Sequence, residues 1–226
     1  MTSVATAADH PRLHLGCGER HLPGYVNIDF PPAQHTVQRK SVADQHADIC
    51  GLVYRRESIA EVRLHHVFEH FRRPTACALL AVWHSWLAPG GRLHVEVPDL
   101  FRSLLVICNP LRSARRKAVA ERHLFGSHEA PWAAHYEAYT SASLRRAMEA
   151  FGYTPIRTRR HGWRGTFNVE VMAEKRGATR SANEYRAAAR RYLADFLVDD
   201  TPGELALLDV WMRAYDEQFA RGYASD

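Results

Sequence analysis

The chain has 226 residues, of which 46% are hydrophobic and 24% charged, and its formal net charge is +5. This size suits one globular domain with a helical appendage. The first ten residues lack the cationic start and apolar core of a signal peptide, and no segment reaches the roughly 18 apolar residues of a membrane span. We therefore expect a cytoplasmic protein without a membrane span.

The cysteines and the basic residues exclude two further classes. Cys17, Cys50, Cys77 and Cys108 are widely separated and form no Cys-x-x-Cys pair, so neither a zinc knuckle nor a disulfide framework is indicated. Basic residues cluster at 112–117 and 157–164. We interpret both clusters as solvated faces, although the first has the composition to contact phosphates of a nucleotide-sugar, a lipid headgroup or RNA.

The N-terminal elements point to an adenosine-containing cofactor. A short apolar run ends in Gly16-Cys17-Gly18, and a second predicted strand at 25–30 carries Asp29. Glycines let a ligand approach the backbone, and an acid at the next strand tip can accept hydrogen bonds from both ribose hydroxyls. The third glycine of a dinucleotide fingerprint is missing, and the acid comes sooner than the roughly 20 residues that fingerprint requires, so no pyrophosphate cradle is indicated.

The middle of the chain alternates predicted strands and helices. A strand ends at 47–49, and 58–67 reads as a helical turn running into a strand. A helix runs from Pro74 to Leu87 and is stopped by 88–91, a strand spans 92–97, and a basic helical stretch at 100–125 is broken at 109–110.

The C-terminal part predicts helices around a strand pair. Thr140 caps a helix that Gly152 ends, and 153–159 and 167–174 form an antiparallel pair at a sheet edge. Helices follow at 181–198 and 202–223, the second with the capping-box spacing of Thr201 and Glu204. We expect an α/β fold: a Rossmann-like, doubly wound, mostly parallel sheet with helices on both faces, a terminal antiparallel pair and C-terminal helices. The expected division is a flexible terminus at 1–11, a cofactor-binding domain at 12–176 and a helical extension at 177–226.

Six short motifs in this order resemble the class I S-adenosylmethionine (SAM)-dependent methyltransferases, most closely a bacterial branch associated with sugar or cell-surface glycan modification. They are Leu15–Gly18, Gly24–Asp29, Ala47–Ile49, Ser58–Val62, Val67–Phe71 and Leu87–Gly91. The resemblance covers about residues 12–175 and lies in the order of many weak motifs.

The resemblance assigns cofactor contacts residue by residue. It implies that the backbone of Gly16, Cys17 and Gly18 holds the methionine part of SAM and that Asp29 holds the ribose hydroxyls. It places Asp48 and Ile49 beside the adenine, with the carboxylate taking the exocyclic amine. A helix cap or turn is the alternative role for Asp48.

The segment 66–70 spells His-x-x-Glu-His, the inverted zinc-peptidase motif. That motif needs a continuous helix, and here the run ends a strand, so we do not favour a peptidase. Within the resemblance, His66 is a cofactor contact, while Glu69 and His70 form the pocket floor near the methyl group or the acceptor. A divalent metal on His66, Glu69 and His70 is not favoured, since relatives usually carry a carboxylate where this chain has His66.

The loop at 125–139 presents a candidate catalytic histidine. In the resembled family this region closes over the cofactor, and His135 best fills the place of the histidine that faces the acceptor. A loop histidine bonded to backbone is the alternative. Trp132, Tyr136, Tyr139 and Trp163 could form a stacking wall or ordinary packing.

The sequence thus predicts a SAM-dependent methyltransferase that O-methylates a hydroxyl of a small molecule or glycan, with His135, Glu69 and His70 as catalytic candidates. The alternatives are an RNA or protein methyltransferase and a non-catalytic binding protein. A nucleic-acid partner is not favoured, because no appended module is present. The C-terminal helices are a candidate homodimer surface.

Overall fold

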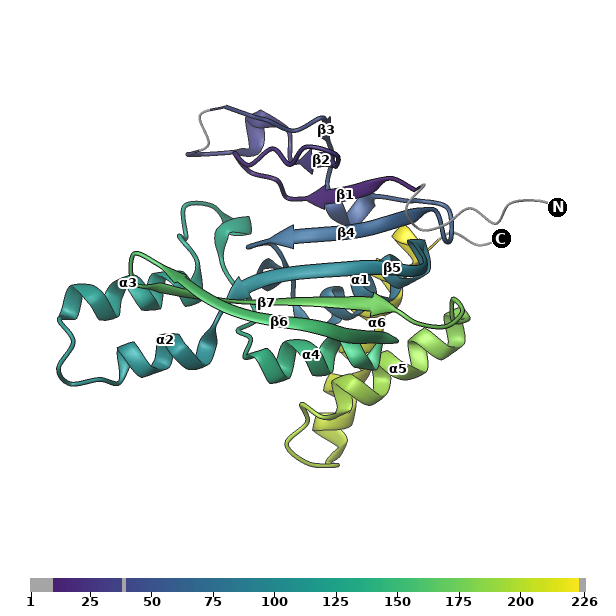
Figure 1. The fold of residues 1–226 in the computed structure, drawn as a ribbon. Coiled ribbons are helices and arrows are strands. Elements are labelled where there is room, and N and C mark those ends of the chain that lie inside the picture. Colours follow the sequence, from purple (N-terminus) through teal and green to yellow (C-terminus); the bar gives the residue numbers. More distant parts are fainter. Residues whose placement is uncertain (1–9, 38–39, 224–226) are drawn as a thin grey trace.

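A computed structural model describes residues 10–37 and 40–223 as a seven-stranded sheet with helices (Figure 1). The strand order is β3-β2-β1-β4-β5-β7-β6. Strands β1 to β5 are parallel, and β7 is antiparallel to both β5 and β6. The bounds are β1 (Arg12–Leu15), β2 (Val26–Asp29), β3 (Gln45–His46), β4 (Ile59–His65), β5 (Leu87–Pro98), β6 (Tyr153–Trp163) and β7 (Thr166–Lys175). The predicted Rossmann-like fold with its terminal antiparallel pair is confirmed.

Short polar side chains cap the start of several helices. Thr140 and Ser143 form a capping box at α4, and Asp99 accepts from the Arg102 amide at the start of α2. The helices are α1 (Arg73–Trp86), α2 (Leu100–Ile107), α3 (Ala114–Phe125), α4 (Ser141–Ala150), α5 (Ala182–Ala194) and α6 (Pro202–Gly222). The described residues also form the 3-10 turns η2 (Pro32–Gln34), η3 (Ile49–Gly51), η4 (Phe68–His70) and η5 (Pro131–Ala133).

One face of the sheet is covered by α1, α4, α5 and α6, and this layer forms the core (Figure 1). The C-terminal helices share that core: the Trp86 indole of α1 donates to the Gly222 carbonyl of α6 at 3.1 Å. A Cβ at Gly222 would lie 2.8 Å from Val82, so the helices meet closely there. The boundary at 176 and the homodimer surface stay predictions, and residues 1–9 of the predicted flexible terminus lie outside the described residues.

The opposite face, which we call the open face, carries polar side chains. Arg63 of β4 lies opposite His14 of β1 and His94 of β5, so these three side chains share one face. Within the described residues no helix runs along this face, because the β1–β2 and β2–β3 connections contain loops and η2 in place of helices. Helix α3 reaches only the carboxyl end of the face, where His123 Nε2 lies 2.7 Å from Asn168 Oδ1. The expectation of helices on both faces is therefore not met.

Several local predictions differ from the structure. The segment 58–62 is not a helical turn, because β4 runs unbroken from Ile59. The 47–49 segment passes into η3 and does not end a strand, and 88–91 opens β5 directly after α1. Within residues 10–37 and 40–223 the Thr201 side chain makes no capping bond, and the Glu204 carboxylate accepts from the Val198 amide. Among the described residues no helix is long and apolar enough to span a bilayer, and the cytoplasmic location stays a prediction.

Candidate functional site

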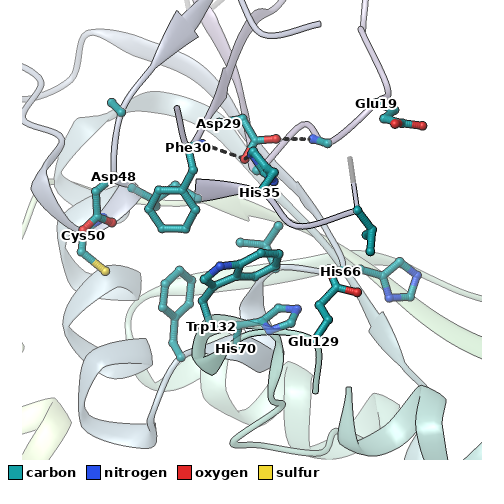
Figure 2. Close-up of a pocket in the computed structure, with 17 residues that line it drawn as sticks. Glu19, Asp29, Phe30, His35, Asp48, Cys50, His66, His70, Glu129 and Trp132 are labelled. Atoms are coloured by element: carbon teal, nitrogen blue, oxygen red, sulfur yellow. Dashed lines mark hydrogen bonds and ion pairs between the residues drawn. The ribbon is translucent and has the colours of Figure 1, made fainter. Parts of the chain in front are cut away.

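A cavity of about 570 Å³ opens at the carboxyl ends of β1, β2 and β4. Its walls include Gly16, Gly18, Asp29, Asp48, Ile49, His66 and His70 from the sequence prediction. They also include Glu19, Phe30, His35, Val37, Ala47, Cys50, Val67, Phe71, Glu129 and Trp132. Figure 2 shows the Asp48 end and the His66 end on opposite sides of the cavity. The predicted residues Cys17, Glu69 and His135 do not line it.

The glycine turn after β1 keeps the backbone open to the cavity. Gly16 and Gly18 adopt φ values of +66° and +56°, which side-chain-bearing residues rarely adopt. A Cβ at Gly16 would lie 2.4 Å from a Val67 methyl, whereas the Cβ position of Gly18 has nothing within 4 Å. Cys17 is only 3% exposed, and burial raises the pKa of its thiol to about 11, so it is an inert core residue.

Asp29 ties the glycine turn to the tip of β2. Its Oδ2 accepts from the Gly18 amide at 2.7 Å and its Oδ1 from the Phe30 amide at 2.8 Å (Figure 2). A carboxylate offers about four lone-pair sites, so acceptor capacity remains for two ribose hydroxyls. Nearby, the His35 Nε2 lies 3.7 Å from Asp29 Oδ1 and has no hydrogen-bond partner in the described part of the chain. The sequence analysis missed His35, since nothing local marks the loop after Pro31-Pro32 as returning to Asp29.

The Asp48 end of the cavity suits a flat apolar ring that carries a hydrogen-bond donor at its edge. Ile49 is buried, and the rings of Phe30 and Phe71 also line this space. Asp48 Oδ1 accepts from the Cys50 amide at 2.9 Å, so the helix-cap role of Asp48 is confirmed. The carboxylate nevertheless belongs to the cavity wall and keeps acceptor capacity.

Two loops meet over the cavity. The Trp132 indole donates to the Gln34 carbonyl at 3.1 Å, and the Thr36 hydroxyl donates to Glu129 at 3.1 Å. The indole also meets the His35 ring edge-on, with centroids 5.8 Å apart. Of the four aromatic residues considered for a wall, only Trp132 lines the cavity: Tyr139 is buried, while Tyr136 and Trp163 are exposed elsewhere. Glu129 was missed because its partner lies 93 positions away.

His66 stands between two carboxylates at the cavity wall. Its Nδ1 lies 3.3 Å from Glu69 Oε1, and its Nε2 lies 3.5 Å from Glu96 Oε1. Burial alone would lower the pKa of His66, but the bonds and charges of the two carboxylates outweigh it and raise the pKa to about 10. The motif that begins at His66 lies on a strand end and η4 and not on a continuous helix, which agrees with rejecting a zinc peptidase.

Behind the cavity wall, Glu69, His70 and His135 form one cluster. Glu69 is 1% exposed, its Oε1 lies 4.0 Å from His135 Nε2, and its Oε2 has no hydrogen-bond partner among the described residues. The rings of His70 and His135 meet edge-on at 4.5 Å. Each ring bonds a carbonyl through Nδ1: His70 to Ala134 at 3.2 Å and His135 to Leu124 at 3.0 Å. Since a carbonyl only accepts, Nδ1 carries the proton when either ring is neutral, and Nε2 is left as an acceptor.

The residues that could hold a metal here differ from the predicted set of His66, Glu69 and His70. One ligand atom each from Glu69, His70 and His135 lies within 4.8 Å of the others, and His66 is not in this group. His135 makes the backbone bond that the sequence analysis gave as an alternative to catalysis, and it also belongs to the cluster. Burial lowers the pKa of His135, so the ring is neutral at pH 7.

The glycine turn and the acid at the next strand tip, both at the carboxyl edge of a Rossmann-like sheet, define a protein that binds an adenosine-containing cofactor. The profile of a family described as a methyltransferase domain matches residues 13–158. The chain belongs to the class I SAM-dependent methyltransferases, and SAM is its cofactor. The open turn at Gly18 and the spare acceptors of Asp29 and Asp48 fit that cofactor.

A solved structure with a TM-score above 0.5 supports the fold. A chain of the complex between the Haloferax volcanii Trm112 methyltransferase activator and the putative methyltransferase has a TM-score of 0.52 at 13% identity, with 76% of this chain and 84% of that chain covered. The Burkholderia thailandensis 1,6-didemethyltoxoflavin-N1-methyltransferase, solved with S-adenosylhomocysteine, gives 0.49 at 17% identity, with 75% and 73% covered. A SAM-dependent methyltransferase from Methanosarcina mazei gives 0.47 at 14% identity, with 74% and 93% covered. No curated protein matches the chain.

Proposed function

We propose that this methyltransferase methylates a hydroxyl group of a small molecule or glycan, and that the hydroxyl approaches the cluster of Glu69, His70 and His135. In this proposal Gly16, Gly18 and the Cys17 backbone hold the methionine part of SAM, Asp29 the ribose, Asp48 and Ile49 the adenine, and His66 the cofactor at the opposite wall. SAM supplies an electrophilic methyl group on a sulfonium, and the cavity positions it and excludes water.

The observation that carries the proposal is the pair of Nε2 atoms left as acceptors in the cluster. A hydroxyl becomes a good nucleophile only as its proton is removed, and a neutral histidine beside a carboxylate suits that task. His70 lines the cavity and therefore faces the acceptor. His135 and Glu69 lie directly behind His70, where the buried carboxylate stabilises a transferred positive charge.

Turnover by single-residue variants tests this proposal. His70→Ala and His135→Ala should each lower kcat by about 10²- to 10⁴-fold towards a hydroxyl acceptor found by screening. Their affinity for S-adenosylhomocysteine should stay within about twofold, because neither ring belongs to the glycine turn, the ribose acid or the adenine end. His128→Asn is the matched control: His128 lies in the same loop, is exposed and has φ +57°, which Asn tolerates. Wild-type kcat in both test variants would contradict the proposal.

An RNA acceptor is the second candidate, because the structure brings the two basic clusters together. A Cβ at Gly165, beside the 157–164 cluster, would lie 3.6 Å from the Arg116 side chain of the 112–117 cluster. Such a combined patch suits a phosphate backbone. A gel shift with bulk RNA at moderate salt separates the candidates. Tight, salt-sensitive binding lost in Arg116→Ala would favour RNA over a small hydroxyl acceptor.

A further inference from the structure

Three adjacent strands bring a second cluster of metal-ligating side chains together on the open face. Glu96 lies on β5, Glu170 on β7 and His161 on β6, the three strands at one side of the sheet (Figure 1). One ligand atom from each lies within 4.8 Å of the others, and His161 Nε2 is 3.3 Å from Glu96 Oε1. This cluster is separate from the residues that line the cofactor cavity.

In the part of the chain that the structure describes, neither carboxylate of this cluster pairs with an arginine or a lysine. Glu96 and Glu170 are directly opposite each other in the β5–β7 pair, and like charges in that position destabilise a sheet. Among the described residues their ion-pair partners are all histidines: His66 and His161 for Glu96, and His94 for Glu170. Arg159 of β6 lies opposite Glu170 of β7, but no ion pair joins these two described residues.

A buried histidine aimed at the cluster is the second observation. His94 is 1% exposed, and its Nε2 lies 2.5 Å from Glu170 Oε1. Within the described residues, neither of its ring nitrogens has a hydrogen bond of acceptable geometry. A buried polar group without such a bond is costly unless another partner satisfies it. Glu96 also accepts from the Asn168 amide at 2.9 Å, but that neutral donor does not offset its charge. A cation bound beside Glu170 would offset the charge of both facing carboxylates and give the His94 ring a ligand bond.

We propose that Glu96, His161 and Glu170 bind a divalent first-row transition-metal ion, with His94 as an additional ligand. Mixed imidazole and carboxylate ligands favour Zn²⁺, Co²⁺, Fe²⁺ or Mn²⁺ over Mg²⁺ and Ca²⁺, which prefer oxygen alone. The ion holds Glu96, whose Oε1 lies 3.5 Å from His66 Nε2. Because His66 lines the cofactor cavity, the ion also positions one wall of that cavity from outside it.

Co²⁺ titration of the full chain tests this site. Protein without an affinity tag, stripped with a chelator, should bind one Co²⁺ per chain with a visible absorption band, and Zn²⁺ but not Mg²⁺ should displace it. Glu96→Gln and His161→Ala should each weaken Co²⁺ binding at least about tenfold. Glu174→Gln is the matched control, since Glu174 lies on the same strand and face as Glu170 but pairs with Arg176. Its Co²⁺ affinity should equal that of the wild type.

Two results would overturn the proposal. One is the absence of a Co²⁺ band in folded wild-type protein. The other is a band that His135→Ala removes and Glu96→Gln leaves intact, since the ion would then occupy the cluster behind the cavity. If Glu96→Gln fails to fold, His161→Ala still decides the matter, because its partly exposed side chain lies on the edge strand β6.

Discussion

The two faces of the sheet differ in what covers them and in what they carry. On the helix-covered face, Leu93, Val95 and Val171 are fully buried among the side chains of the core. On the open face, the positions between them hold His94, Glu96 and Glu170, whose partners are other polar side chains. The apolar face therefore supplies the hydrophobic stabilisation, and the titratable groups gather on the other face and at the carboxyl edge.

The largest expected effect is a difference in stability between substitutions at two neighbouring positions of β5, one on each face of the sheet. Leu93→Ala should lower the free energy of unfolding by about 2–5 kcal/mol, because it leaves a cavity in the core. Arg92→Ala, on the exposed side, should change it by less than about 0.5 kcal/mol. Urea denaturation measures both. Equal losses would mean that the open face is packed as tightly as the covered one.

The second largest effect is expected at the glycine turn, which lies at the carboxyl edge of the sheet. Gly16→Ala should cost about 1–3 kcal/mol of stability and weaken SAM binding, because the new Cβ meets Val67 at a positive φ. Gly24→Ala is the control: Gly24 has φ +79° but open space around its Cβ position. Gly24→Ala should lose stability through backbone strain alone, and its affinity for the cofactor should not change. Calorimetric titration of both variants with S-adenosylhomocysteine separates strain from the clash.

Protonation distinguishes a histidine of the core from one at the cavity edge. Burial, aided by Lys175 and Arg180, lowers the pKa of His84 to about 3, whereas the pKa of His66 is raised to about 10. Below pH 6.5 the unfolded chain binds a proton at position 84 that the folded chain rejects, so stability falls as the pH drops from 6.5 towards 3. His84→Gln, which keeps an acceptor for the Tyr185 hydroxyl, should flatten this slope by about 1 kcal/mol between pH 6.5 and 5.

Denaturation at pH 7, 6 and 5 measures that slope. His46→Gln serves as the control, because His46 is exposed on the edge strand β3 and bonds only the Phe30 carbonyl through Nδ1. An unchanged slope in His84→Gln would show that His84 is not the neutral buried histidine of this account.

The smallest expected effect is kinetic. Since burial lowers the pKa of His135, the acid limb of kcat for a hydroxyl acceptor should lie below pH 6.5. A pH profile of kcat at saturating SAM measures it. An acid limb well above pH 6.5 would contradict a catalytic cluster in which His135, behind His70, stays neutral.

Local signals were enough to predict the mostly parallel sheet, its terminal antiparallel pair and the residues at strand ends. Gly16, Gly18, Asp29 and Asp48 reach one cavity because each follows a strand of the same parallel sheet. The pairing of His70 with His135 and the approach of His35 to Asp29 depend on loops, whose course no local pattern specifies.

The sequence does contain a pattern that indicates the open face, although the prediction of helices on both faces did not take it into account. The strands at 61–65 and 92–97 alternate charged and apolar residues, as in Glu61-Val62-Arg63-Leu64-His65. Parallel strands buried on both faces are instead near-continuous apolar runs. Alternation in the central strands of a parallel sheet therefore indicates that one face lacks its helices.

Calorimetric titration with S-adenosylhomocysteine tests the central claim most directly, that the cavity at the carboxyl edge holds the cofactor. The wild-type chain should bind one molecule per chain. Asp29→Ala should weaken binding by about 10- to 100-fold, the effect of removing charge-assisted hydrogen bonds. No binding by the folded wild-type chain, or equal affinity in a folded Asp29→Ala variant, would contradict the account.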